Sequence, residues 1–272
     1  MKELTDAEFR RIRDYIKANY GINMGDEKKA LIYSRLRATL VSGGFESFTQ
    51  YFDSLLSDKN EEAIRNFVNK VTTNHTFFMR ETDHFKFFRE TVLPYIEDTY
   101  GREKDVRLWC AACSSGEEPY TLQMIMQDYF EGKGWNTEIL ATDISANVLD
   151  KAYYGVYPIE RVEAMPPEWR NKYFKKHDDK NMVVIDKIKK NILFRRRNLM
   201  DSFTKYKFKK KMQVIFCRNV MIYFDNDTRN ETVQKFYEVT ENGGYLFIGH
   251  SESLTHTGTD YKYIMPAVYR KN

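Results

Sequence analysis

Two apolar segments of strand length each end in residues that could bind a nucleoside. VRLWCAA runs into a turn of small residues at positions 114–116, followed by Glu117 and Glu118, and TEILATDI ends at Asp143. A turn of small residues after a strand lets a ligand approach the backbone and the start of the next helix. A carboxylate at the end of the neighbouring strand can bind the hydroxyls of a ribose. Together, the turn and Asp143 favour a nucleoside cofactor.

Both features also have ordinary structural explanations. The turn contains one glycine, Gly116, where a dinucleotide fingerprint has three, so it equally resembles a plain strand-to-helix connection. Asp143 or Ser145 can cap the helix predicted over SANVLDKAYY. Because Ser145 suits the cap position by itself, Asp143 is left available for a ligand.

The charge at the turn distinguishes between cofactors. A dinucleotide places its pyrophosphate at the helix N-terminus, where Glu117 and Glu118 would repel it. S-adenosylmethionine has no phosphate and carries a sulfonium and an ammonium group, so the same carboxylates favour it. We therefore expect S-adenosylmethionine as the cofactor.

The cysteines do not indicate a metal site. Cys110 and Cys113 form a C-x-x-C motif, but the sequence has neither a second C-x-x-C nor an H-x-x-x-H to complete a tetrahedral zinc site. With Cys217 the number is odd, which is typical of a reduced compartment rather than a disulfide framework. We expect no metal.

The composition is typical of a globular cytoplasmic enzyme. The chain has 272 residues, 42% of them apolar, which is enough for one large domain or two smaller ones. It has no apolar run of about 20 residues, and its charged N-terminus lacks the apolar core of a signal peptide. The net charge of +4 is too small to indicate nucleic-acid binding. We expect neither membrane insertion nor a nucleic-acid partner.

Residues 1–75 are predicted to form a helical domain. Thr5 and Glu8 make a capping box at the start of a first amphipathic helix. Further amphipathic segments lie near residues 27–41, 47–57 and 60–71.

Residues 76–272 are predicted to form an α/β domain. Four apolar runs have strand length, and helix-like segments follow two of them: VRLWCAA, TEILATDI, MQVIFCRNV and GGYLFIGH. This alternation predicts a mostly parallel sheet covered on both faces. The Lys- and Arg-rich segment 156–197, which contains the β-like NMVVI, is interpreted as a small inserted subdomain. The segment YIMPAVYRKN is interpreted as an added edge strand, since Pro266 is tolerated there.

Five separated motifs together resemble one known family. They are Thr73–Glu81 (TNHTFFMRE), Ala111–Tyr120 (AACSSGEEPY), Ala141–Ile144 (ATDI), Cys217–Phe224 (CRNVMIYF) and Gly249–Glu252 (GHSE). In this order, they closely resemble the chemotaxis receptor methyltransferases, the CheR family. The resemblance spans nearly the whole chain.

The resemblance implies a fold, an activity and a set of site residues. The fold is a helical N-terminal domain followed by a Rossmann-like S-adenosylmethionine domain with a small inserted β-subdomain. The activity is glutamyl O-methylation of chemoreceptors, with S-adenosylhomocysteine as the product. By the same resemblance, Tyr223 stands near the transferred methyl, and the cofactor site is lined by Asn74, Thr76, Arg80, Ala111, Glu117, Asp143, Asn198, Leu199, Arg218 and Asn219.

The sequence also departs from the family pattern. Met79 replaces a commoner aromatic residue, and Cys113 replaces a smaller residue in the cofactor turn. The insertion lacks the Gly-x-Gly loop of members that dock a receptor's C-terminal pentapeptide. We therefore expect no pentapeptide tether.

The expected reaction requires positioning rather than a base. A glutamate is already ionised at pH 7, so a dry pocket that aligns the reactants is sufficient. Phe77, Phe78 and Tyr223 are candidate walls, and Arg80 is the candidate for orienting a carboxylate or the cofactor. Without the motif, a surface ion pair would be the usual role for Arg80.

A basic helix face is the candidate receptor-docking surface. Within KKALIYSRLRATL, Ile32, Leu36 and Leu40 form an apolar stripe, flanked by Lys28 and Arg35 on one side and Arg37 on the other. This surface suits the acidic helical region of a receptor that bears the methylated glutamates. A merely solvated basic face explains the charges equally well.

Three other functions remain open. A nucleic-acid methyltransferase would use the same cofactor and the basic segments 187–190, 195–197 and 205–211, but Met165–Glu168 matches the adenine-N6 motif only in part, and no cysteine follows a proline. Gly249–Ser253 approaches the G-x-S-x-G motif of hydrolases without its final glycine. A regulatory adaptor without turnover is disfavoured by the presence of Arg80 and Tyr223.

Overall fold

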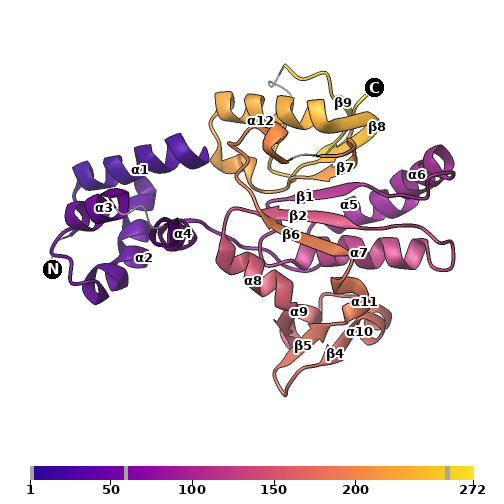
Figure 1. Cartoon of the computed structure of the whole chain (residues 1–272), viewed down its shortest axis with the longest axis horizontal. Coiled ribbons are helices and arrows are strands. Elements are labelled where there is room, and N and C mark those ends of the chain that lie inside the picture. The colour runs from indigo at the N-terminus through magenta and orange to yellow at the C-terminus, as the bar shows by residue number, and fades with distance from the viewer. Residues whose placement is uncertain (1–2, 58–60, 207, 255–257) are drawn as a thin grey trace. The chain divides into compact units, whose positions relative to one another are not determined.

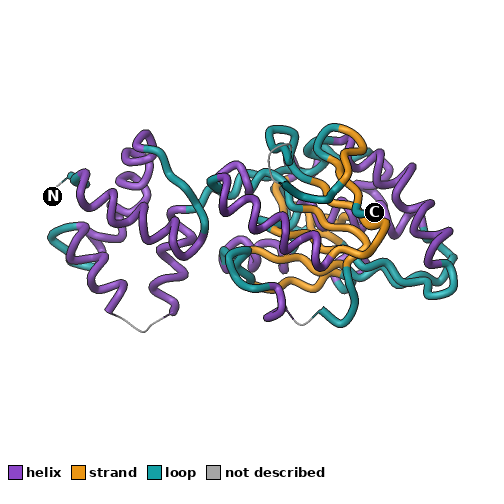
Figure 2. The backbone as a smooth tube through the Cα atoms, turned by 90° about the horizontal axis from the view of Figure 1, so that it is seen from above, coloured by secondary structure: helices purple, strands orange, loops and turns teal. Residues whose placement is uncertain are grey.

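The computed structural model describes residues 3–57, 61–206, 208–254 and 258–272, which divide into two compact units. The helical unit comprises Met1–Thr73 with Tyr223–Thr228, and the sheet unit comprises Asn74–Ile222 with Arg229–Asn272. Figure 2 shows helices and loops in the helical unit, and strands enclosed by helices in the sheet unit. Lys207 of the basic segments lies outside the described residues.

The four predicted N-terminal helices are present. They are α1 (Asp6–Tyr20), α2 (Lys29–Ser42), α3 (Phe48–Ser57) and α4 (Glu61–Val71), with the 3-10 turn η1 (Asp26–Lys28) before α2. The capping box is confirmed, since Glu8 N donates to Thr5 Oγ1 at 3.2 Å and Thr5 N donates to Glu8 Oε2 at 2.9 Å. Asn60, where the fourth helix was expected to begin, lies outside the described residues.

The apolar stripes of these helices form the core of the helical unit. Ile32, Leu36 and Leu40 of α2 are all buried, as their spacing predicted. Phe52 of α3 packs against Phe67 of α4 with ring centroids 5.8 Å apart. Each fully buried side chain of this size contributes about 1.5–3 kcal/mol, so packing rather than helix propensity stabilises the unit.

The sheet unit is built on a seven-stranded sheet, in the order β6-β2-β1-β7-β8-β10-β9. Five neighbouring strands are parallel, which confirms the predicted α/β class: β6 (Ile192–Arg196), β2 (Ile139–Asp143), β1 (Leu108–Ala111), β7 (Met212–Phe216) and β8 (Thr240–Phe247). β6 had been assigned to the insertion from its sequence, but it pairs with β2 at the edge of this sheet. The segment that leaves the sheet therefore ends before Ile192.

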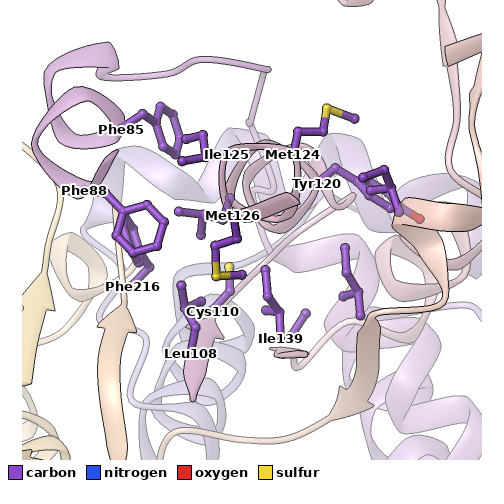
Figure 3. Close-up of a cluster of buried hydrophobic side chains, with 14 of the residues drawn as sticks. Phe85, Phe88, Leu108, Cys110, Tyr120, Met124, Ile125, Met126, Ile139 and Phe216 are labelled. Carbon is purple, nitrogen blue, oxygen red and sulfur yellow. The ribbon is translucent and has the colours of Figure 1, made fainter. Parts of the chain in front are cut away.

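Helices cover both faces of the sheet. On one face, Leu108 and Cys110 pack with α7 (Glu117–Tyr129) and with the helical run α5 (Thr82–Phe87), η2 (Phe88–Val92) and α6 (Leu93–Tyr100), as Figure 3 shows. The other face is covered by α12 (Asn226–Val239; Figure 1). There, Trp109 of β1 packs against Phe236 of α12 with ring centroids 5.3 Å apart. Side chains of a strand alternate between faces, so β1 is buried on both, as its continuous apolar run predicted.

The inserted segment forms a small sheet of its own. After α8 (Ala146–Tyr154) the chain makes a three-stranded antiparallel sheet, ordered β3-β5-β4, from Val156–Pro158, Asn181–Val184 and Phe174–Lys176. Short helices accompany it: α9 (Ile159–Val162), α10 (Pro167–Tyr173) and α11 (Asp186–Lys189). Tyr157 OH donates to Ser115 O at 2.6 Å, which joins this small sheet to the turn after β1.

The C-terminal segment forms two strands rather than the single edge strand that we expected. β9 (Lys262–Met265) and β10 (Val268–Arg270) make a hairpin, and β10 lies between β8 and β9. Pro266 and Ala267 occupy the turn, where Ala267 has a φ of +62°. Because the proline sits in the turn, neither strand loses a ladder hydrogen bond to it.

Among the described residues, no helix combines the length and the apolar character required to cross a bilayer. Even α1 has 15 residues, fewer than the roughly 20 that a spanning helix needs.

Candidate functional site

The carboxyl ends of four neighbouring strands form the candidate site. β6, β2, β1 and β7 lie side by side and run in the same direction (Figure 1). Ala111, Asp143 and the residues that follow Arg196 and Phe216 therefore lie along one edge of the sheet. Open α/β sheets bind ligands at this edge. The topology thus brings together six predicted cofactor residues: Ala111, Asp143, Asn198, Leu199, Arg218 and Asn219.

The turn after β1 is joined to two other predicted site residues. Ser114 N donates to Asp143 Oδ2 at 2.8 Å, and Ser114 Oγ donates to Asn74 O at 3.0 Å. Gly116 has a φ of +96°, and a Cβ there would lie 2.8 Å from Ala152 Cβ. The turn therefore requires glycine at this position and holds β1, β2 and Asn74 together.

Asp143 is buried, and its carboxylate accepts backbone N–H groups. Oδ2 accepts from Ser114 N at 2.8 Å, Oδ1 accepts from Ser145 N at 2.9 Å, and the backbone of Ile144 also donates to this carboxylate. Burial raises the pKa of Asp143, and these donors oppose the rise. A carboxylate oxygen can accept a second hydrogen bond, so the group remains able to bind a ribose hydroxyl.

Ser145 begins α8, as predicted, but its side chain does not cap the helix. Its hydroxyl is buried and has no hydrogen-bond partner among the described residues. An unsatisfied buried hydroxyl costs free energy that a polar ligand would recover. Its position beside Asp143 therefore suits the hydroxyls of a nucleoside.

Glu117 is fully buried at the first residue of α7. Its Oε2 accepts from Ser115 Oγ at 2.7 Å, and its Oε1 pairs with Arg161 Nη1 of α9 at 2.9 Å. Negative charge is favourable at this helix end and excludes a phosphate. The structure therefore agrees with the phosphate-free cofactor expected from the sequence.

Arg218 is the centre of a buried ion-pair network. Its Nη1 donates to Glu118 Oε2 at 2.8 Å and its Nη2 donates to Glu81 Oε2 at 3.0 Å, while Nη2 also donates to the backbone carbonyl of Arg80. The side chain is 2% exposed. The guanidinium therefore fixes the backbone at Arg80 relative to the start of α7.

Asn219 adopts a left-handed backbone with a φ of +58°. Its N donates to Glu252 Oε2 at 2.9 Å, and its side-chain amide donates to Glu81 Oε1 at 3.2 Å. Glu252 also accepts from Ile222 N at 3.0 Å, and burial raises the pKa of this carboxyl. The GHSE motif therefore supports the loop after β7 and does not form a hydrolase elbow.

Arg80 is hydrogen-bonded through its guanidinium, and its side chain is 27% exposed. Its Nη1 donates to His75 O at 2.9 Å, and its guanidinium lies 5.8 Å from the ring centroid of Phe77. Phe77 is partly exposed, whereas Phe78 is buried against Tyr157, with ring centroids 4.9 Å apart. Phe78 is therefore a core residue and not the pocket wall that we expected.

Left-handed backbone conformations concentrate at this site. Of the seven non-glycine residues with such a backbone among the described residues, five lie in the segments described above: Met79, Glu81, Ala112, Ser114 and Asn219. Such conformations cost about 1–3 kcal/mol each and persist where the surrounding contacts impose them. Here, the hydrogen bonds of Glu81, Ser114 and Asn219 supply those contacts.

The remaining predicted cofactor residues occupy the same segments. Asn198 follows β6, where its Oδ1 accepts from Met200 N at 3.1 Å, and Leu199 is buried next to it. Thr76 lies between Asn74 and Arg80 and is partly buried, and Ala111 is buried at the end of β1.

The other predicted residues belong to the helical unit. Tyr223 O accepts from Asn23 N at 2.6 Å, and Tyr223 clusters with α1 to α4, whereas Arg80 belongs to the sheet unit. Lys28 and Arg37 are exposed. Arg35 is half-buried, and its Nη1 donates to the carbonyls of Val71, at 3.1 Å, and Thr72, at 2.9 Å.

Four charged or polar partners in the sheet unit were not predicted from the sequence. Glu81, Arg161 and Glu252 hold the predicted residues in place, and His84 is buried beside Glu81. The signal for Glu81 and Glu252 was their presence in recognised motifs. Nothing in the sequence indicated a role for Arg161. It lies among the basic residues of the insertion, and its partner, Glu117, is 44 positions away along the chain.

Comparisons with known proteins match both units. The family model described as "CheR methyltransferase, SAM binding domain" matches residues 74–269, and the one described as "CheR methyltransferase, all-alpha domain" matches residues 7–72. The chain is 41% identical to the chemotaxis protein methyltransferase of Borreliella burgdorferi, over 99% of this chain and 95% of that protein. It is 35% identical to chemotaxis protein methyltransferase 2 of Vibrio cholerae, over 93% and 87%. It is 34% identical to the chemotaxis protein methyltransferase of Escherichia coli, over 93% and 86%.

Proposed function

This chain belongs to the CheR methyltransferase family, and we propose that it transfers the methyl group of S-adenosylmethionine to glutamate side chains of chemoreceptors. The family match confirms the resemblance, the methyltransferase fold and the cofactor that the sequence predicted. The observation that carries the proposal is the near-full-length similarity to chemotaxis protein methyltransferases. The alternative of a nucleic-acid methyltransferase is not favoured.

The cofactor is proposed to lie at the carboxyl edge of the sheet. Its ribose hydroxyls would meet Asp143 and Ser145, and its cationic groups would lie towards Glu117. Supporting this placement, Asp143 retains acceptor capacity and Ser145 has an unpaired buried hydroxyl. The proposed lining comprises Asn74, Thr76, Arg80, Ala111, Glu117, Asp143, Asn198, Leu199, Arg218 and Asn219.

The acceptor glutamate needs no base from this chain. Its carboxylate is ionised at pH 7, so one oxygen attacks the methyl carbon while the carbon–sulfur bond breaks and the electron pair stays on sulfur. The products are a glutamate methyl ester and S-adenosylhomocysteine. Since the carboxylate and the sulfonium neutralise each other, a water-poor pocket favours the reaction. Arg80 is proposed to position these groups, with Phe77 as a wall.

The receptor is proposed to dock through its acidic helical region on Lys28, Arg35 and Arg37. Lys28 and Arg37 are exposed and suit this role. Arg35 contributes less, because its guanidinium is bonded to the end of α4. A pentapeptide tether is not proposed, since the hairpin between β4 and β5 turns through His177–Lys180 without glycine.

Transfer of radiolabelled methyl groups to receptor-containing membranes tests the activity. We expect label on receptor glutamates that is released by base, as methyl esters are. Label in nucleic acid, or none in receptors, would reject the proposal.

Charge reversal tests the docking surface separately. Arg37→Glu should lower receptor methylation several-fold and leave the affinity for S-adenosylmethionine unchanged by calorimetry. Arg10→Glu on the exposed face of α1 is the matched control. Equal receptor methylation by Arg37→Glu and Arg10→Glu would rule out α2 as the docking surface.

A further inference from the structure

Glu81, His84 and His250 bring three metal-ligand groups together in the sheet unit. One ligand atom from each lies within 4.8 Å of the others. His84 Nδ1 is 3.5 Å from Glu81 Oε2, and the ring centroids of His84 and His250 are 4.6 Å apart. Donors around a tetrahedral zinc ion lie about 3.4 Å from one another. The Glu81–His84 pair already has this spacing, and rotation of the partly exposed His250 side chain would close the wider separations.

His84 is the strongest indication of a missing ligand. Its side chain is fully buried, and neither ring nitrogen has a hydrogen-bond partner among the described residues. Buried polar groups without partners are rare in native proteins. A neutral imidazole carries a lone pair on one ring nitrogen, which it can offer to a cation.

His250 supplies an oriented second imidazole and access from solvent. Its Nε2 lies 3.1 Å from Asp83 Oδ2, and its side chain is 43% exposed. A carboxylate that holds one nitrogen of a histidine orients the other nitrogen towards a metal. An ion can therefore reach the cluster through the partly exposed histidine.

The surrounding charges allow a divalent cation. Arg218 and Arg80 lie near Glu81 and oppose a cation, since Arg218 Nη2 is 3.0 Å from Glu81 Oε2. Three carboxylates, those of Glu81, Asp83 and Glu118, outnumber these two guanidinium groups. The five side chains together therefore carry one excess negative charge.

From these observations, we propose that Glu81, His84 and His250 bind one Zn²⁺ ion, with Asp83 orienting His250. Two imidazoles and one carboxylate suit zinc. The ion would fasten the start of α5, immediately after Arg80, to the loop after β8. No metal was expected from the sequence, since neither a second C-x-x-C nor an H-x-x-x-H accompanies Cys110 and Cys113. His84 and His250 lie far apart along the chain, so their spacing gave no signal of a site.

Zinc titration of the purified full-length chain, without a histidine tag and after treatment with a chelator, tests this site. We expect calorimetry to give one Zn²⁺ per chain. His250→Ala should weaken binding at least tenfold, and Asp83→Ala should weaken it less. Both variants change partly exposed side chains, so the fold should persist. The matched control is His177→Ala, an exposed histidine of the insertion, which should bind as the unaltered chain does.

Cobalt substitution identifies the ligands independently. Co²⁺ held by nitrogen and oxygen donors gives visible absorption without the near-ultraviolet band that thiolates produce. A thiolate band would assign the ion to the cysteines and overturn the proposal. Absence of stoichiometric Zn²⁺ binding, or equal affinity of the His250→Ala and His177→Ala variants, would overturn it as well. None of these readouts depends on methyl transfer, so their failure leaves the proposed function untouched.

Discussion

The helical unit and the sheet unit use charged side chains in different ways. In the helical unit, charged groups act at the surface, as in the Lys17–Asp225 pair, whose side chains are 49% and 28% exposed. In the sheet unit, Arg218 and Glu117 are almost fully buried and pair with distant residues. Surface pairs contribute little, whereas a buried charge that loses its partner is costly. The carboxyl edge of the sheet should therefore respond far more strongly to loss of charge than the helical unit.

The largest effect is expected for Arg218→Met. The substitution leaves Glu81 and Glu118 partly buried without their cation, which should lower the free energy of unfolding by about 3–5 kcal/mol. Trp109, Trp135 and Trp169 all lie in the sheet unit, so tryptophan fluorescence during urea denaturation reports this unit specifically. Arg195→Met, at an exposed arginine of β6, should change the value by less than about 0.5 kcal/mol. Similar free energies of unfolding for the two variants would contradict the claim that the buried ion pairs make this edge of the sheet sensitive to loss of charge.

A second comparison uses glycines with a left-handed backbone. Gly116→Ala should cost about 2–4 kcal/mol, since φ is +96° and the new Cβ would lie 2.8 Å from Ala152 Cβ. Gly44→Ala in the helical unit should cost only about 1 kcal/mol, because φ is +71° but nothing lies within 4 Å. Denaturation followed by tryptophan fluorescence measures the loss of stability for Gly116→Ala. Denaturation followed by circular dichroism measures it for Gly44→Ala. Gly116→Ala should also weaken S-adenosylmethionine binding, and undiminished affinity would show that the turn is not part of the cofactor site.

Arginines of α2 provide a test within the helical unit. Arg35→Met removes hydrogen bonds to the carbonyls of Val71 and Thr72 and should destabilise α4 by about 1–2 kcal/mol. Arg37→Met should have no measurable effect, because Arg37 is exposed. Hydrogen exchange of the α4 backbone amides distinguishes the two variants, since protection should fall in Arg35→Met only. Equal protection in both variants would mean that Arg35 does not hold the end of α4.

The smallest effect is expected for Asp225→Asn. The hydrogen bond and charge of Lys17 hold the pKa of Asp225 below its usual value, so the pair stabilises the fold above about pH 4 and this contribution is lost as the pH falls further. At pH 7 the substitution should cost less than about 1 kcal/mol. Thermal unfolding of the unaltered chain and of Asp225→Asn should be compared at pH 7 and near pH 2.5. The difference in stability between them should be smaller at the lower pH. A difference that grows in acid would exclude this pairing as its cause.

Local features of the fold were predictable, and long-range pairings were not. The capping box of Thr5 and Glu8 involves residues three positions apart, and the stripe of Ile32, Leu36 and Leu40 repeats with the helical period, so both are visible in the sequence. The position of β10 inside the sheet was missed, because a short apolar run carries no information about its neighbours.

The same distinction applies to the site. The residues at strand ends could be predicted, since parallel strands place their carboxyl ends at one edge. The pairing of Arg218 with Glu81 joins residues 137 positions apart, and the pairing of Glu117 with Arg161 joins a helix to the insertion. No periodicity or local spacing signals such contacts. Their partners could be found only when the folded chain brought them together.

The hairpin of β9 and β10 has a consequence for synthesis on the ribosome. β10 pairs with β8, and Lys271 beyond it donates through Nζ to the carbonyls of Tyr237 and Thr240. These residues emerge after every other strand of the sheet has left the exit tunnel. Until then, the outer edge of β8 is unpaired and open to association with other nascent chains. The sheet unit therefore reaches its final form only once translation has passed its last strand.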